Sequence, residues 1–99
     1  MTFSTTITLD EATRKTVDTI LYDGGKLFTG EAITRTATFN NGFQMDIKCC
    51  GSDEGNCWCE AVLVDPEGDE VQTQAGDDEF TGDWECTDRD GNTYQVTVI

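Results

Sequence analysis

The segment Asn40-Asn41-Gly42 separates two runs in which alternate positions are mostly apolar. The alternating positions are Ile33, Arg35, Ala37 and Phe39 before the segment, and Phe43, Met45, Ile47 and Cys49 after it. This alternation is typical of strands with one buried face, and Asn-Gly between two such runs is the strongest local signal for a β-hairpin. The middle of the chain is therefore predicted to form two antiparallel strands.

The remaining segments indicate more short strands joined by tight turns. Residues 57–64 include the continuous apolar run 61–64, which is typical of a strand covered on both faces. Turn-forming residues fill 65–69 and 88–92, and strands are expected at 5–9, 71–74, 80–86 and 94–99. These connections are too short for crossovers, so we expect an α+β fold with an antiparallel β-sheet meander of about six strands. At 99 residues, the chain has the length of a single domain spanning 1–99.

One N-terminal helix is expected to pack on this sheet. The less polar residues of this segment recur at helical spacing, at Thr13, Val17, Ile20 and Leu21. Gly24-Gly25 is suited to ending the helix. Either Thr8, in a capping box with Glu11, or Asp10 would serve as the N-cap. Because threonines lower the helix propensity of this segment, a strand at 17–22 remains an alternative.

Negative charge is concentrated in the second half of the chain. There are 20 acidic and 6 basic residues, which gives a net charge of −14. Residues 1–50 contribute −1 and residues 51–99 contribute −13, with Arg89 as the single base of the second half. A small domain is adequately soluble with a net charge of about 2 to 8 in magnitude, so solubility alone does not require this excess. Such a field repels nucleic acid and anionic membranes and attracts basic protein grooves.

The composition also argues against catalysis. The chain has no histidine, which excludes Ser-His-Asp and Cys-His mechanisms. Asp88-Arg89-Asp90-Gly91-Asn92 begins like a calcium loop but lacks the bidentate glutamate that an EF-hand needs, so it is interpreted as a turn. We expect a protein that is not an enzyme and binds no cofactor. Because no apolar run approaches the roughly 18 residues of a membrane span and the N-terminal residues do not resemble a signal peptide, we expect a cytoplasmic protein.

Five cysteines leave three interpretations open. Four of them occur as Cys49-Cys50-x6-Cys57-x-Cys59 and the fifth is Cys86. This spacing lacks the Cys-x2-Cys knuckles of structural zinc sites, and the expected location does not favour disulfides between Cys49 or Cys50 and Cys57 or Cys59. Free thiols packed in the core are the favoured interpretation, because Cys57 and Cys59 share a strand face with apolar residues. No metal site is therefore expected.

The acidic residues of the second half are the candidate partner-binding residues. Alternation along 80–86 places Asp83 and Glu85 on the solvent face, about 6.8 Å apart. Turns and loops are expected to add Asp53, Glu54, Asp65, Glu67, Asp69, Glu70, Asp77, Asp78 and Glu79. Duplex DNA is also a rigid array of negative charge, so such a surface can occupy a DNA groove lined by lysine and arginine.

In its size, its one-sided acidity and its expected fold, the chain resembles the small phage-encoded anti-CRISPR and antirestriction proteins, many of which are DNA mimics. The resemblance implies a basic nucleic-acid-binding partner in the cytoplasm of a bacterial host cell, such as a CRISPR effector or a nuclease. It implies no direct contact with nucleic acid or membrane. An acidic structural or interaction module without mimicry and a small cysteine-coordinated zinc domain are the alternatives.

Overall fold

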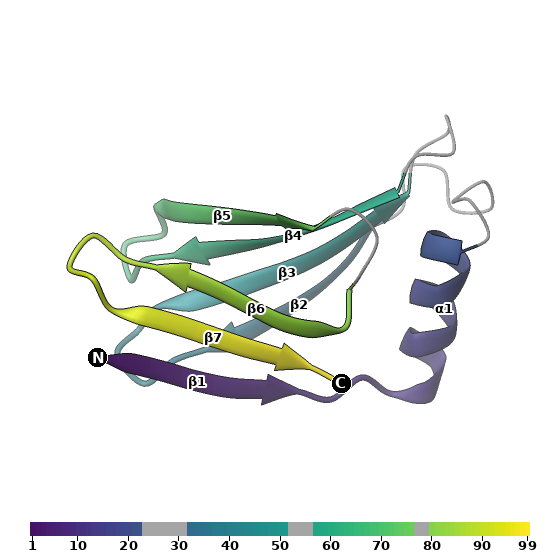
Figure 1. The fold of residues 1–99 in the computed structure, drawn as a ribbon, viewed down its shortest axis with the longest axis horizontal. Helices are drawn as coiled ribbons and strands as arrows, with labels where there is room; N and C mark the ends of the chain where they lie inside the picture. The colour runs from purple at the N-terminus through teal and green to yellow at the C-terminus, as the bar shows by residue number, and fades with distance from the viewer. Residues whose placement is uncertain (23–31, 52–56, 77–79) are drawn as a thin grey trace.

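The computed structural model describes residues 1–22, 32–51, 57–76 and 80–99. These residues form one helix and seven strands in two stacked sheets (Figure 1). In chain order the elements are β1 (Thr2–Ile7), α1 (Glu11–Tyr22), β2 (Ala32–Thr38), β3 (Gln44–Gly51), β4 (Cys57–Val64), β5 (Glu70–Gly76), β6 (Gly82–Thr87) and β7 (Thr93–Val98). The prediction of a mostly β fold with one short helix is confirmed.

The prediction of a single meander of about six strands is wrong. One sheet has the order β2-β3-β4-β5 and is antiparallel throughout, whereas the other has the order β1-β7-β6. Strand β1 pairs in parallel with β7, so the first strand lies beside the last. Turn signals cannot reveal this pairing, because its partners lie about 90 positions apart in the chain. The chain forms a second sheet because both sets of strands have an apolar face to cover.

Three hairpins have the same turn geometry and lie at one end of the sandwich (Figure 1). In 39–43, 65–69 and 88–92 the N–H of the first residue donates to the carbonyl of the fifth, at 2.8, 2.9 and 3.0 Å. The fourth residue of each is a glycine with φ of 93°, 91° and 86°, a backbone region in which a side chain is strained. These turns match the predicted ones. We call the end formed by residues 39–43, 65–69 and 88–92 the hairpin end.

The two inner faces meet in a single core among the described residues. Fully buried side chains from both sheets include Met45, Ile47, Leu63, Val96 and Val98. Gly76 is required for the packing of Trp84, because a Cβ at Gly76 would lie 2.9 Å from Cη2 of the indole. The core therefore depends on backbone and side-chain shape as well as on apolar character.

Helix α1 lies at the end of the sandwich opposite the hairpin end and packs against β3 and β4 of the four-stranded sheet (Figure 1). Asp10 is its N-cap: the carboxylate accepts the N–H of Thr13 at 2.6 Å, so the Thr8 alternative is wrong. The strand alternative at 17–22 is also wrong, because the helix continues to Tyr22. The predicted helix end at Gly24-Gly25 lies outside the described residues. Nη2 of Arg35 on β2 donates to Oγ1 of Thr13 at 2.9 Å, which ties the helix to its neighbouring sheet.

Side chains join the two sheets where the edge strands β5 and β6 meet. The N–H of Glu85 donates to Oε1 of Gln74 at 2.6 Å, and the N–H of Thr87 donates to Oε1 of Gln72. Two glutamines thus accept from two of the outward-pointing N–H groups of β6, which fixes this edge strand against the other sheet. Within the described residues, no helix is long and apolar enough to cross a membrane.

Candidate partner-binding surface

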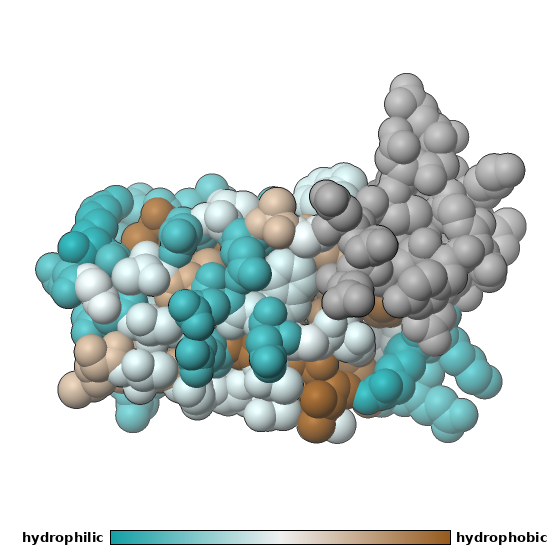
Figure 2. Space-filling view, viewed as in Figure 1, coloured by the Kyte–Doolittle hydropathy of each residue, from teal (hydrophilic) through white to brown (hydrophobic). Residues whose placement is uncertain are grey.

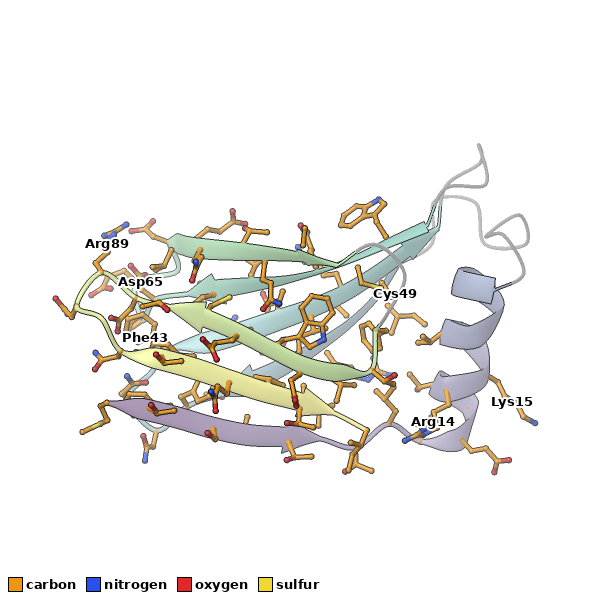
Figure 3. The ribbon with its side chains drawn as sticks, in the orientation of Figure 1. Arg14, Lys15, Phe43, Cys49, Asp65 and Arg89 are labelled. Carbon is orange, nitrogen blue, oxygen red and sulfur yellow. The ribbon has the colours of Figure 1, made fainter. Side chains whose placement is uncertain are left out.

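Acidic residues from two neighbouring turns gather at the hairpin end. The turn between β4 and β5 supplies Asp65, Glu67 and Asp69, and Glu70 begins β5. The turn between β6 and β7 supplies Asp88 and Asp90. Arg89 stands between these last two, and its side chain lies near the edge of this cluster in Figure 3.

Two further carboxylates continue from this end along β6. Asp83 and Glu85 are exposed on the outer face of the strand, whereas Trp84 and Cys86 are buried, as the alternation predicts. Oδ1 of Asp83 accepts the hydroxyl of Thr97 at 2.7 Å, and Oε2 of Glu85 accepts the side-chain amide of Gln95 at 3.0 Å. Both carboxylates are therefore oriented by β7.

We define the acidic strip as these carboxylates of β6 and the two turns. Its members are Asp65, Glu67, Asp69, Glu70, Asp83, Glu85, Asp88 and Asp90. Figure 2 shows hydrophilic side chains over the hairpin end and on the neighbouring part of the front face. The strip thus covers one end and one edge of the sandwich.

Asp88 is the most constrained carboxylate of the strip. Its Oδ1 accepts the N–H groups of Asp90 and Asn92 at 2.9 and 3.0 Å. Its Oδ2 accepts the amide of Asn92 at 2.9 Å and the hydroxyl of Tyr94 at 2.7 Å. Desolvation opposes ionisation, but these hydrogen bonds outweigh it and lower the pKa of Asp88 to about 2. The strip therefore contains a fixed negative charge.

Asp65 has the corresponding position in the other turn. One of its oxygens accepts the N–H groups of Glu67 and Asp69 at 3.1 and 2.9 Å. Capping of this kind is what Asp contributes to a tight turn. Asp65 and Asp88 therefore shape the loops that present the exposed carboxylates.

Tyr94 links the acidic turn at 88–92 to the core. Its hydroxyl accepts the amide of Asn41 at 3.0 Å while donating to Asp88, so it joins turns from different sheets. Its buried ring stacks on Phe3 and Phe43 at centroid distances of 5.1 and 4.9 Å. Desolvation and the Asp88 carboxylate raise the pKa of Tyr94, which therefore stays a hydrogen-bond donor at neutral pH. This connection ties the turn at 39–43 to the turn at 88–92.

A pocket of about 290 Å³ lies between the two acidic turns. Phe43, Pro66 and Val71 supply apolar lining (Figure 3 labels Phe43 and Asp65). Asp65, Glu67, Asp88, Arg89 and Asp90 complete the lining. Such a lining can accept a side chain with an apolar stem and a cationic head.

The predicted partner-binding residues fall into three groups. Asp65, Glu67, Asp69 and Glu70 lie together at the hairpin end, and Asp83 and Glu85 lie on β6. The other predicted residues, Asp53, Glu54, Asp77, Asp78 and Glu79, lie outside the described residues.

The turn at 88–92 was expected to add acids to the surface, but Asp88 and Asp90 were not named among the predicted partner-binding residues. A sequence signal for their placement exists. Asp-x-x-Gly occurs at 65–68 and again at 88–91, and equivalent hairpins in a meander present their turns at the same end. Tyr94 had no such signal, because it occupies an ordinary apolar position of the last strand.

Charges of both signs occur elsewhere on the described surface. The outer face of the other sheet carries Asp46, Lys48 and Glu60, and Asp46 accepts the hydroxyl of Thr36 at 2.7 Å. Helix α1 carries Arg14 and Lys15 at the end opposite the hairpin end (Figure 3). Among the described residues, negative charge is therefore concentrated in the acidic strip.

Three cysteines are buried thiols, as the favoured interpretation predicts: Cys49, Cys59 and Cys86. A hydrogen bond with Cys59 lowers the pKa of Cys49 against the effect of burial, whereas burial raises the pKa of Cys86 to about 11. In the part of the chain that the structure describes, no three potential ligands among Cys, Asp and Glu are grouped to hold a metal. The side chains of Cys50 and Cys57 lie outside that part.

Comparisons with protein-family models, curated proteins and solved structures find no match to this chain. The acidic strip is therefore the feature from which a function can be inferred.

Proposed function

We propose that this protein is a non-enzymatic inhibitory binding protein that inserts its acidic strip into the DNA-binding groove of a basic nucleic-acid-handling protein. We expect the partner to be a CRISPR effector or a nuclease in the cytoplasm of a bacterial host cell. The observation that carries the proposal is the gathering of eight carboxylates on one end and one edge of the sandwich, with Arg89 as the base among them.

The geometry of the strip supports imitation of a nucleic acid. Consecutive outward residues on a strand lie about 6.8 Å apart, which gives Asp83 and Glu85 a regular spacing. Their hydrogen bonds to β7, and those within the acidic turns, hold the charges on a rigid frame. Rigid charges lose little conformational freedom when a cationic groove binds them.

The uneven distribution of charge favours this function over general acidity. Acidity that served only solubility or salt tolerance should be spread over the surface. The outer face of β2–β5 and the helix instead combine acids with Lys48, Arg14 and Lys15. The local excess of negative charge in the strip also attracts a basic partner.

The pocket between the acidic turns supports a specific contact within the larger surface. Arginine and lysine side chains of a DNA groove have apolar stems and cationic heads, which suits a lining of Phe43, Pro66 and nearby carboxylates. Contact with an aromatic ring also favours a cation.

The test is capture of bacterial lysate proteins on the immobilised chain, followed by elution with duplex DNA. We expect DNA to release the specifically bound protein, and the isolated partner to lose DNA binding when the chain is added. Retention of the partner in saturating DNA, or simultaneous binding of both, would contradict the proposal. A captured partner without a DNA-binding surface would favour the interaction-module alternative.

A further inference from the structure

Two buried cysteines lie directly opposite each other on neighbouring strands. The register of β3 and β4 pairs Cys49 with Cys59. Their exposed fractions are 0% and 1%, and the two thiols are hydrogen-bonded to each other. Each thiol therefore has the other as a close neighbour in the core.

The hydrogen-bond pattern places this pair at a site where the strands approach closely. The N–H of Phe39 donates to the carbonyl of Phe43, so these two residues form a hydrogen-bonded pair. Such pairs occur at every second position of an antiparallel ladder, so the backbone groups of residues 45, 47 and 49 also point toward β2. The backbone groups of Cys49 consequently point away from β4, and Cys49 with Cys59 is a non-hydrogen-bonded pair. Such pairs have Cα atoms about 4.5 Å apart, inside the roughly 4.4 to 6.8 Å range that a disulfide bridges.

No other cysteine pair among the described strand residues is directly opposed. The register places Cys50 opposite Trp58, and Cys57 opposite Gly51. Cys86 belongs to the other sheet and is opposite Tyr94.

We propose that Cys49 and Cys59 form an oxidative modification site, closed to a cross-strand disulfide by a low-molecular-weight disulfide such as oxidised glutathione. The Cys59 or Cys49 thiolate attacks the glutathione disulfide and releases one reduced glutathione. The second cysteine, as its thiolate, then attacks the mixed disulfide, which forms the protein S–S bond and releases the second glutathione. Two protein thiols lose two electrons and two protons, and one glutathione disulfide is reduced to two thiols.

Because both cysteines are buried, the exchange takes place in the open or unfolded chain, and the native register stabilises the product. Because folding and disulfide formation are thermodynamically linked, a disulfide that stabilises the fold must form more favourably in the folded chain than in the unfolded one. The cross-link closes a loop of about ten residues. For a loop of this length, the chain-entropy model gives a ratio of disulfide to dithiol that is roughly 100-fold higher in the folded than in the unfolded chain.

The test uses a C50S/C57S/C86S variant, which keeps only this pair, and a C50S/C57S/C59S control, which keeps Cys49 and Cys86. Each is equilibrated in glutathione redox buffers, folded and in urea, from both reduced and oxidised starting material. Alkylation and mass spectrometry give the ratio of disulfide to dithiol. We expect this ratio to be roughly 100-fold higher in the folded than in the unfolded state for the first variant, and no such increase for the control.

An equal or lower ratio in the folded state of the first variant would overturn the proposal. Should that variant fail to fold, the wild-type chain provides the measurement by peptide mapping after refolding in the same buffers. A peptide link between Cys49 and Cys59 is the expected product. Links involving Cys50, Cys57 or Cys86 instead, or mixed disulfides with glutathione alone, would also overturn it.

Discussion

At the scale of single residues, Asp88 both caps a turn and carries a negative charge, although its partial burial opposes ionisation. As a turn cap it accepts four hydrogen bonds, and as a member of the acidic strip it contributes negative charge. The hydrogen bonds keep the carboxylate ionised in a partly buried position. Glu67 and Asp90 by contrast are exposed. Removing charge at these exposed positions should leave the hairpin end intact.

Asp88→Asn should therefore change the dependence of stability on acid. The folded-state pKa of about 2 lies below the usual value for Asp of about 3.9, so ionised Asp88 stabilises the fold above pH 4. This contribution is lost as pH falls from about 4 to about 2. We expect the variant to have a lower melting temperature at pH 7 and a smaller loss of stability over that acidic window.

Thermal unfolding between pH 2 and pH 7 measures both effects, and Asp90→Asn provides the control. Asp90 is exposed in the same turn, and its substitution removes the same charge. The two variants behaving alike would show that net charge, and not the hydrogen bonds of Asp88, determines the acid sensitivity.

At the scale of elements, the start of α1 tests which residue caps the helix. The sequence left Thr8 and Asp10 as alternatives, because both have suitable side chains at suitable positions. In the structure Asp10 accepts the N–H of Thr13, and its backbone carbonyl accepts the N–H of Arg14 at 3.0 Å. We expect Asp10→Ala to lower the free energy of unfolding by about 0.5–2 kcal/mol and Thr8→Ala to change it little. Urea unfolding of both variants measures this, and a larger loss for Thr8→Ala would contradict the assignment.

A second prediction at this scale concerns the edge between β5 and β6. Replacing Gln72 and Gln74 by Ala removes the acceptors of the Thr87 and Glu85 N–H groups. These two amides should then exchange with deuterium at least about fivefold faster, since they lose a hydrogen bond worth about 1 kcal/mol or more.

The neighbouring amides of Trp84 and Cys86 provide the internal control, because β6 bonds to β7 at these alternate positions. Residue-resolved hydrogen exchange distinguishes the two sets. Equal acceleration of all four amides would indicate loosening of the whole strand and would contradict a specific role for the glutamines.

The elements show why part of the fold was predictable. Asn-Gly at 41–42 and the glycines at 68 and 91 are local signals, and all three hairpins form as their spacing indicates. The pairing of β1 with β7 depends on contacts between the two ends of the chain, which no local pattern encodes. The alternation of apolar and polar residues also does not distinguish a single sheet from two stacked sheets, because it shows only that one face of each strand is buried.

At the scale of the whole molecule, the candidate surface was predicted better than its shape. The charge asymmetry identified Asp65, Glu67, Asp83 and Glu85, because composition and strand alternation depend only on the sequence. Their arrangement depends on the sandwich, which brings the two acidic turns to one end. It also places Glu60, on β4, in a different sheet from Asp83 and Glu85 on β6. The role of Asp88 beside Asp65 follows from that arrangement.

The central claim is that position, and not only net charge, makes this acidic surface a binding site. Two triple variants that each remove three negative charges separate these possibilities. E67Q/D83N/E85Q replaces three of the eight carboxylates of the acidic strip with amides that retain hydrogen-bond acceptors, and leaves the turn caps Asp65 and Asp88 in place. E11Q/D46N/E60Q removes the same charge from the helix and the opposite sheet.

The most direct measurement is the affinity of both variants for the captured DNA-binding partner, by calorimetry at several salt concentrations. We expect wild-type binding to weaken steeply with salt. The strip variant should bind roughly tenfold more weakly at low salt, since three exposed charge contacts are worth about 0.5 kcal/mol each. The opposite-sheet variant should bind nearly as well as wild type. Equal losses in the two variants, or unchanged affinity in the strip variant, would contradict the account.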